Sequence, residues 1–152
     1  MRFILILLLS LGVARVGAQT YQERAVAAVL MGEAWSEGAQ GMTAVVEVIH
    51  RRSVLKDKTL LAIIAERNRK SGIWAFSCLN GVGIDRLIQK FQKEPDFTEA
   101  LRIAQIATRT PNKLPGMTKG ATHFTLARER PYWARGHRPV AVLGSHAFYR
   151  LP

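Results

Sequence analysis

The sequence has one cysteine, few acidic residues and no hydrophobic run long enough to cross a membrane. Cys78 has no second cysteine to pair with, so the folded domain must be held together by packing rather than by a disulfide. The N-terminal apolar run, from Phe3 to Leu9 and less purely to Val13, is shorter than the ~20 residues of a membrane-spanning helix. The 22 lysine and arginine residues exceed the 11 acidic ones and give a formal net charge of +11, which favours polyanionic partners.

The first residues have the pattern of a secretory signal peptide. A single arginine precedes the apolar run, and Val16 and Ala18 supply a V-G-A version of the A-x-A cleavage site. We predict a cleavable signal at residues 1–18 and one exported domain at residues 19–152, in the periplasm or at the extracellular cell wall. An uncleaved N-terminal anchor is the alternative. Export makes nucleic acid the least natural polyanion, and leaves anionic lipid and anionic wall polymers.

The first two thirds of this domain have the hydrophobic spacing of helices, with apolar residues three and four positions apart. The spacing predicts four helices, at Tyr21–Ala34, from Gln40 to about Val54, at 59–67 and at 95–108. Thr59 is the expected N-cap of the third. Asp96, followed by Glu99 three residues later, resembles a capping box at the start of the fourth.

The character of the chain changes after Thr110. Residues 111–120 contain the prolines and glycines of a loop. Residues 121–127 and 139–150 are rich in aromatic and β-branched residues and predict strands, joined by the basic loop 128–138. Helices followed by a small antiparallel sheet near the C-terminus indicate a mainly helical domain of the α+β class.

Two glutamates follow the apolar run of the first predicted helix, in the motif GEAWSEG, Gly32 to Gly38. A charged group at the end of a buried run is costly unless it is solvated, paired or used in chemistry. Glu33 directly follows the apolar run and adjoins Trp35, and a carboxyl group against an aromatic wall loses hydration, which favours the protonated form that a general acid needs. Glu33 is therefore a candidate general acid, and a solvated charge at the helix end is the alternative for both Glu33 and Glu37.

The histidines and the lone cysteine are further candidates for reactive groups. His123, His137 and His146, together with a glutamate, have the residue types of a zinc hydrolase site. However, no H-x-x-x-H or H-E-x-x-H pattern occurs, and His123 and His146 lie in strand-like segments where structural histidines are common. We therefore predict no metal and no cofactor, and we interpret Cys78 as a small buried residue rather than a nucleophile.

Several aromatic residues lie beside polar neighbours near the glycine-containing turns. Trp35 precedes a serine, and Trp133 follows Tyr132 and precedes Arg135 by two positions. Rings in such positions suit a cleft that binds sugars by stacking, and packing in the core is the alternative. Basic residues in the segment 119–138 are candidates to contact an anionic polymer.

Three ordered blocks of the sequence carry a family resemblance. The first is GEAWSEGAQGMTAVVEVIHRR, at 32–52, and the others are FSC and GATHF…PYW…VAVLGSHAFYR. Together they resemble the SleB-type cell-wall hydrolases, the family of the spore cortex-lytic enzymes, whose first block reads approximately G-E-A-x-G-E-x-x-x-G-Q-x-A-V-A-x-V-x-x-N-R. The chain departs from this pattern at Ser36, Met42 and Arg51, where the family has Gly, Gln and Asn.

The resemblance implies an enzyme that cleaves the glycan strand of peptidoglycan between N-acetylmuramic acid and N-acetylglucosamine. Many members of the family act as lytic transglycosylases, using the first glutamate of the first block, which is Glu33 here. The family fold, mainly helical with a small antiparallel sheet beside a lysozyme-like cleft, agrees with the prediction from spacing. We expect peptidoglycan as the partner, a monomer, no nucleic acid, and no membrane span after signal cleavage.

The residues expected to bind substrate come from these motifs and from the aromatic candidates. They are Trp35, Glu37, Phe76, Ser77, His123, Phe124, Trp133 and His146. The alternatives are a hydrolysing muramidase in which Glu37 or Asp85 activates water, a zinc amidase that cuts the peptide stem, and a wall-binding module without enzymatic activity.

Overall fold

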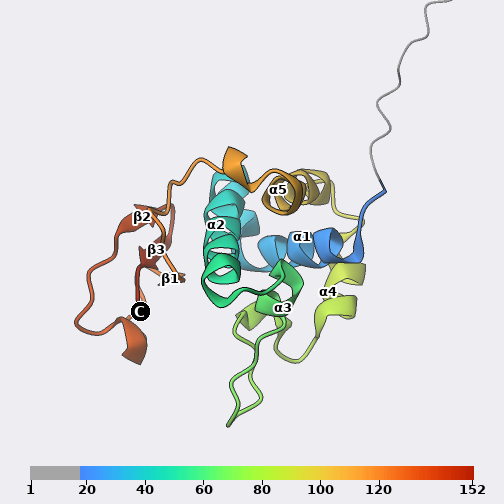
Figure 1. Ribbon diagram of the computed structural model, residues 1–152. Helices are drawn as coiled ribbons and strands as arrows, with labels where there is room; N and C mark the ends of the chain where they lie inside the picture. Colours follow the sequence, from blue (N-terminus) through green and yellow to red (C-terminus); the bar gives the residue numbers. More distant parts are fainter. Residues whose placement is uncertain (1–17) are drawn as a thin grey trace, which may run out of the picture.

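The computed structural model describes residues 18–152, in which five α-helices precede a three-stranded sheet (Figure 1). The helices are α1 (Tyr21–Ala34), α2 (Gly38–Lys56), α3 (Leu60–Ile64), α4 (Ile84–Phe91) and α5 (Phe97–Arg109). The strands are β1 (His123–Leu126), β2 (Ala141–Leu143) and β3 (His146–Tyr149). This arrangement confirms the α+β class. The predicted signal peptide falls on residues 1–17, outside the described part, and on Ala18. No helix within residues 18–152 combines the length and the apolarity needed to cross a membrane.

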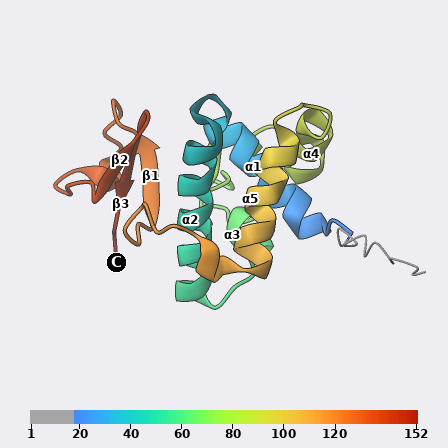
Figure 2. The ribbon, with the colours of Figure 1, turned by 90° about the horizontal axis from the view of Figure 1, so that it is seen from above.

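Helix α1 is the centre of the hydrophobic core, and its bounds are those predicted from the apolar spacing. The residues from Ala25 to Met31 are at most 2% exposed, so the helix is buried on every side. Helices α2, α4 and α5 surround it, as Figure 2 shows. A helix in this position needs apolar residues around its whole circumference, which explains the unbroken run AVAAVLM.

The first turn of α1 contains a buried carboxylate. Glu23 is 2% exposed and forms a capping box with Thr20: each side chain accepts a hydrogen bond from the backbone N–H of the other residue, at 3.0 and 3.1 Å. Arg109, the last residue of α5, donates to both carboxylate oxygens of Glu23, at 2.6 and 2.9 Å. These hydrogen bonds hold the pKa of Glu23 below its usual range and join the start of α1 to the end of α5.

The capping box predicted at the start of α5 is wrong. Asp96 does precede α5, but its side chain makes no cap and instead accepts a hydrogen bond from the indole N–H of Trp35 at 2.7 Å. Glu99 pairs with Arg102 rather than with the N-cap backbone. Tertiary and side-chain partners therefore replace the expected capping box. The short helix α4 was not predicted, whereas the N-cap of α3 is Thr59 as expected.

The sheet has the strand order β1-β3-β2, and both pairings are antiparallel. The central strand β3 is buried along its whole length. The predicted strand at 139–150 is in fact two strands, because the chain reverses at Gly144, whose φ of +55° lies in the left-handed region that favours glycine. The reversal places Leu143 of β2 beside His146 of β3.

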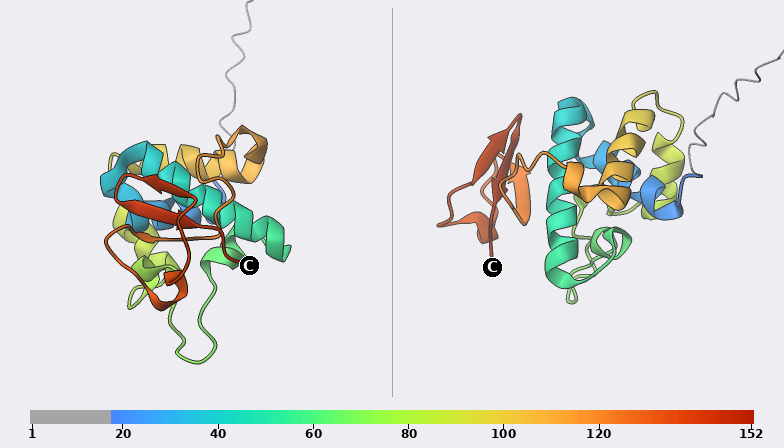
Figure 3. Two further views of the ribbon diagram at one scale, coloured as in Figure 1. Left: turned by 90° about the vertical axis from the view of Figure 1, so that its left-hand side faces the viewer. Right: turned by 45° about the horizontal axis from the view of Figure 1, so that its top comes forward.

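The sheet packs on the side of α2 that faces away from the other helices (Figures 2 and 3). A small apolar cluster joins the two layers, built from Ala44 and Val48 of α2 against Ala121 and Phe148. The small side chain of Ala44 allows the Phe148 ring of β3 to approach α2. Five partly buried residues pack against this cluster, namely Met117, Phe124, Val140, Ala141 and Leu143. Polar contacts also fix the position of the sheet.

Two carboxylates from the helical side supply these polar contacts. Glu47 of α2 is buried and accepts hydrogen bonds from the backbone N–H groups of Gly116, Met117 and Thr118 and from the Thr118 hydroxyl, at 2.6 to 3.1 Å. Glu37 accepts hydrogen bonds from the backbone N–H and the hydroxyl of Ser145, in the turn between β2 and β3. These bonds lower the pKa of Glu37, so the carboxylate form is favoured.

The ion pair between the buried Glu23 of α1 and Arg109 of α5, whose side chain is 42% exposed, generates a pH-dependent prediction. We expect Glu23→Gln to lower the free energy of unfolding by about 1–3 kcal/mol at neutral pH. The folded-state pKa lies below the usual value of 4.5, so the contribution of the carboxylate is complete above that value and is lost as the pH falls through the folded pKa. Urea denaturation at several pH values should therefore show the two proteins converging in acid. Glu94→Gln is the control, and a difference that stayed constant with pH would contradict the assignment.

Candidate active site

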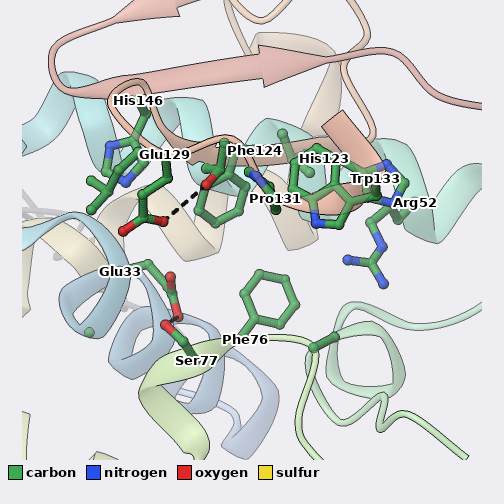
Figure 4. A pocket seen from close by; sticks show the side chains of 15 residues that line it. Glu33, Arg52, Phe76, Ser77, His123, Phe124, Glu129, Pro131, Trp133 and His146 are labelled. Carbon is green, nitrogen blue, oxygen red and sulfur yellow. Dashed lines mark hydrogen bonds between the residues drawn. The ribbon is translucent and has the colours of Figure 1, made fainter. Parts of the chain in front are cut away.

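A pocket of about 530 Å³ lies between the helical layer and the sheet (Figure 4). The end of α1, the second half of α2 and the segment 75–77 form one wall. Residues of β1, β3 and the loop that follows β1 form the other. Residues that are more than 100 positions apart in the sequence therefore meet here. Seven of the nine predicted site residues line this pocket: Glu33, Phe76, Ser77, His123, Phe124, Trp133 and His146.

Trp35 and Glu37, the other two predicted site residues, are not among the residues that line the pocket. Helix α1 ends at Ala34, and the 3₁₀ turn Trp35–Glu37 sends the chain in a new direction. Trp35 is 46% exposed, hydrogen-bonded to Asp96 and packed edge-on against Phe91. Glu37 holds the turn of the sheet. The structure therefore does not place these two side chains with the rest of the predicted site.

Glu33 lies in the last turn of α1, half-buried, at the edge of the pocket. Its Oε1 accepts hydrogen bonds from the backbone N–H of Cys78 at 3.0 Å and from the Ser77 hydroxyl at 3.3 Å. Its Oε2 forms no hydrogen bond with any residue of the described chain, and Figure 4 shows the carboxyl group beside Ser77. The two donors fix the orientation of the carboxyl group while one oxygen stays available to a ligand.

Gly32 allows this arrangement because it gives Cys78 room to approach α1. A Cβ atom at position 32 would lie 2.6 Å from the Cβ and 2.9 Å from the Sγ of Cys78. Burial raises the pKa of the Cys78 thiol, and the neighbouring Glu33 carboxylate raises it further. The thiol is therefore protonated at neutral pH, which agrees with its interpretation as a packing residue rather than a nucleophile.

Aromatic rings cover the wall of the pocket that the sheet provides. The Phe124 ring packs against His146 and Phe76, with centroids 5.6 and 6.3 Å apart. His123 packs against Trp133 at 5.3 Å. Burial and then the positive charges of Arg52 and Lys56 lower the pKa of His123, so its imidazole is neutral at neutral pH. Flat apolar rings with polar edges are suited to contact sugar rings.

Sequence reasoning missed two charged residues of the pocket, Arg52 and Glu129. Arg52 follows Val48 by one turn of α2, and this spacing puts both on the face that meets the sheet. Glu129 is the single acid in the basic loop 128–138 and accepts a hydrogen bond from the Thr125 hydroxyl at 3.3 Å. Figure 4 shows Glu129 on the wall opposite Glu33. Its position as a single acidic residue within a basic segment could have identified Glu129 as a candidate site residue.

Other candidates lie away from this pocket. Asp85 accepts a hydrogen bond from the Tyr21 hydroxyl at 2.8 Å in a separate hollow on the far side of α1. His137 does not line the pocket with His123 and His146. Within residues 18–152, no three side chains of histidine, cysteine, aspartate or glutamate come together as they would to hold a metal ion.

Comparison with protein families identifies a match. A family model described as Cell Wall Hydrolase matches residues 36–149, well over half of the chain. The matched range begins three residues after Glu33 and includes the sheet, Arg52 and the loop with Glu129. The comparisons with curated proteins and with solved structures found no match.

The close approach at Gly32 generates a prediction about stability. Helix propensity alone favours alanine over glycine by about 1 kcal/mol. The contact with Cys78 reverses this sign, and we expect Gly32→Ala to destabilise the protein by about 1–3 kcal/mol through overpacking. Thermal denaturation measures the difference. Adding Cys78→Gly removes the colliding atoms and should recover most of the loss, whereas stabilisation by Gly32→Ala alone would show that position 32 has room.

Proposed function

The chain belongs to the cell wall hydrolase family, and on that premise we propose that it cleaves the glycan strand of peptidoglycan as a lytic transglycosylase. The bond to be cut is the one between N-acetylmuramic acid and N-acetylglucosamine. Glu33 is the single group that donates a proton to the leaving oxygen and then accepts another from the attacking hydroxyl. A substrate in the cell wall agrees with the export expected from the N-terminal residues.

The observation that carries this proposal is the environment of Glu33. The side chain is half-buried in a pocket lined by aromatic rings, and two donors fix Oε1 while Oε2 remains free of hydrogen bonds with residues 18–152. A fixed carboxyl group with one free oxygen is able to hold a proton toward a ligand. A positioned group of this kind contributes about 10²–10⁴-fold to a rate.

In the first step, the protonated carboxyl group of Glu33 donates its proton to the oxygen of the glycosidic bond. The bond between this oxygen and C1 of N-acetylmuramic acid breaks, and the N-acetylglucosamine side leaves as an alcohol. Positive charge develops on the muramic acid ring, and Glu33 is now a carboxylate. The rings of Phe124 and Trp133 are candidates to hold the sugars in place during this step.

In the second step, the Glu33 carboxylate takes the proton from the 6-hydroxyl of the same muramic acid. The 6-oxygen bonds to C1 and closes a 1,6-anhydro ring. Glu33 is protonated again and ready for another cycle. One carboxyl group is sufficient because the second nucleophile belongs to the substrate, so this route does not require the usual pair of carboxylates.

The proposal predicts the products and their dependence on Glu33. We expect the unchanged protein to release muropeptides with 1,6-anhydro ends from purified sacculi, and Glu33→Gln to lower the rate at least ~10²-fold because the amide cannot donate the proton. Mass spectrometry of the products measures both. Asp85→Asn is the matched control and should keep the activity, because Asp85 lies in the separate hollow near Tyr21.

Each alternative gives a different result in the same experiment. Reducing ends in place of anhydro ends would contradict the transglycosylase. Uncut glycans with released peptides would indicate an amidase. If Glu33→Gln did everything that the unchanged protein does, the chain would be a wall-binding module.

The position of Glu129 favours a second candidate function, a hydrolysing muramidase. Such enzymes use two carboxyl groups on opposite sides of the scissile bond, one as acid and one to activate water or attack the sugar. The sequence suggested Glu37 or Asp85 for the second role, but neither lines the pocket with Glu33. Glu129 does line it, from the opposite wall (Figure 4).

Substitution of Glu129 separates the two mechanisms. For the transglycosylase, we expect Glu129→Gln to keep the anhydro products and to lower the rate no more than about tenfold, because Glu129 takes no proton in either step. The measurement is again the product mass, together with the initial rate on sacculi. A loss of ~10²-fold or more, with reducing-end products from the unchanged protein, would establish hydrolysis instead.

A further inference from the structure

The charged side chains that line the pocket are separated along its length. Glu33 and Glu129 lie at one end and Arg52 at the other, with Phe76 between Glu33 and Arg52 (Figure 4). These three are the only lysine, arginine, aspartate or glutamate residues among those found to line it. A ligand that fills the pocket therefore meets carboxyl groups at one end and a cation at the other.

Arg52 belongs to a cluster with excess positive charge. Its side chain is 16% exposed, and its Nη2 donates to Glu66 at 2.5 Å. Glu66 also accepts hydrogen bonds from Lys56, at 2.8 and 2.9 Å, and from Lys58 at 3.2 Å. Three cations thus share one carboxylate, which leaves a formal charge of +2.

The guanidinium group of Arg52 has capacity for a further acceptor. A guanidinium carries five N–H donors, and the bond to Glu66 uses one of them in the described chain. The Cζ atom of Arg52 lies 5.7 Å from the centroid of the Phe76 ring, a residue of the pocket wall. The positive charge of this cluster also acts on the opposite wall of the pocket. After burial, the charges of Arg52 and Lys56 lower the pKa of His123 in β1.

We propose that the Arg52 end of the pocket is an anion subsite, which binds a carboxylate carried by the glycan strand away from the bond that Glu33 cleaves. The identity of the substrate rests on the proposed function. A planar guanidinium binds a carboxylate through two parallel hydrogen bonds, which fixes both distance and orientation. Binding at Arg52 would therefore set which sugar linkage lies beside Glu33.

Carboxylates at two places in the substrate have the required chemistry. One ends the lactyl group of muramic acid and is free only where the stem peptide has been removed. The other belongs to the stem peptide itself. Both are attached to the same sugar, and substrates with and without peptides distinguish them.

The test measures binding rather than turnover, in a Glu33→Gln background that leaves the sacculi intact. Cosedimentation compares Glu33→Gln with Glu33→Gln/Arg52→Gln on native sacculi and on sacculi whose carboxylates have been converted to amides. We expect Arg52→Gln to weaken binding to native sacculi about tenfold or more, the effect of losing hydrogen bonds to a charged group. On amidated sacculi the two proteins should bind within about twofold of each other.

A matched control removes the same charge elsewhere. Arg86→Gln changes an exposed arginine on α4, on the side of the helical layer away from the sheet, and should alter binding less than about twofold at an ionic strength of ~0.15 M (Figure 2). Arg52→Gln leaves Glu66 with two lysine partners, so the fold should persist. Arg52→Lys keeps the charge without the planar geometry and should give an intermediate affinity.

Native sacculi and strands stripped of peptides by an amidase identify the carboxylate. An Arg52 effect that disappears on stripped strands assigns the stem peptide, and one that becomes larger there, where the lactyl carboxylates are free, assigns the lactyl group. An Arg52 effect of equal size on native and amidated sacculi, or no effect of either Arg52 variant, would overturn the subsite. If the proposed cleavage is wrong, the unchanged protein will release no more glycan products from sacculi than Glu33→Gln does. That result is independent of the binding test at Arg52.

Discussion

Two carboxylates of α2 and of the turn before it fix the position of the sheet, and the pocket lies between the two layers that they join. Glu47 accepts four hydrogen bonds from the loop before β1, and Glu37 accepts those of the turn between β2 and β3. An apolar cluster packs the same two layers together. A carboxylate accepts several hydrogen bonds in defined directions, so it orients the groups that donate to it. Glu47 and Glu37 therefore locate one wall of the pocket relative to the other.

The same division of roles applies to Glu33. The apolar interior of α1 gives a rigid support, and the carboxyl group extends from the last turn of that support into the pocket. Gly32 and Cys78 set how closely the segment 76–78 approaches the helix, and that segment provides both donors to Oε1. Packing therefore determines the position of Glu33 that its proposed acid–base role requires. A shift of the segment 76–78 by about 1 Å would lower the reaction rate.

Sequence reasoning was most successful where local patterns decide the structure. The apolar run of α1 and the capping residue Thr59 are signals within a few positions, and both predictions were correct. Asp96 shows the limit, because the indole of Trp35 competes with the local cap and lies 61 positions away. The same limit explains why Arg52 and Glu129 were not predicted as site residues. Both lie in basic segments, and only the folded structure shows that they line the pocket.

The environment of Cys78 affects how readily its thiol would react in an oxidising compartment. An unpaired cysteine in an oxidising compartment normally endangers a protein, because its thiolate attacks other disulfides and joins molecules together. Here the side chain faces α1 at Gly32 and is half-buried, and the carboxylate beside it disfavours ionisation. The contact that positions the proposed acid thus also keeps the thiol slow to react, so a single sulfur atom need not limit the lifetime of the folded domain.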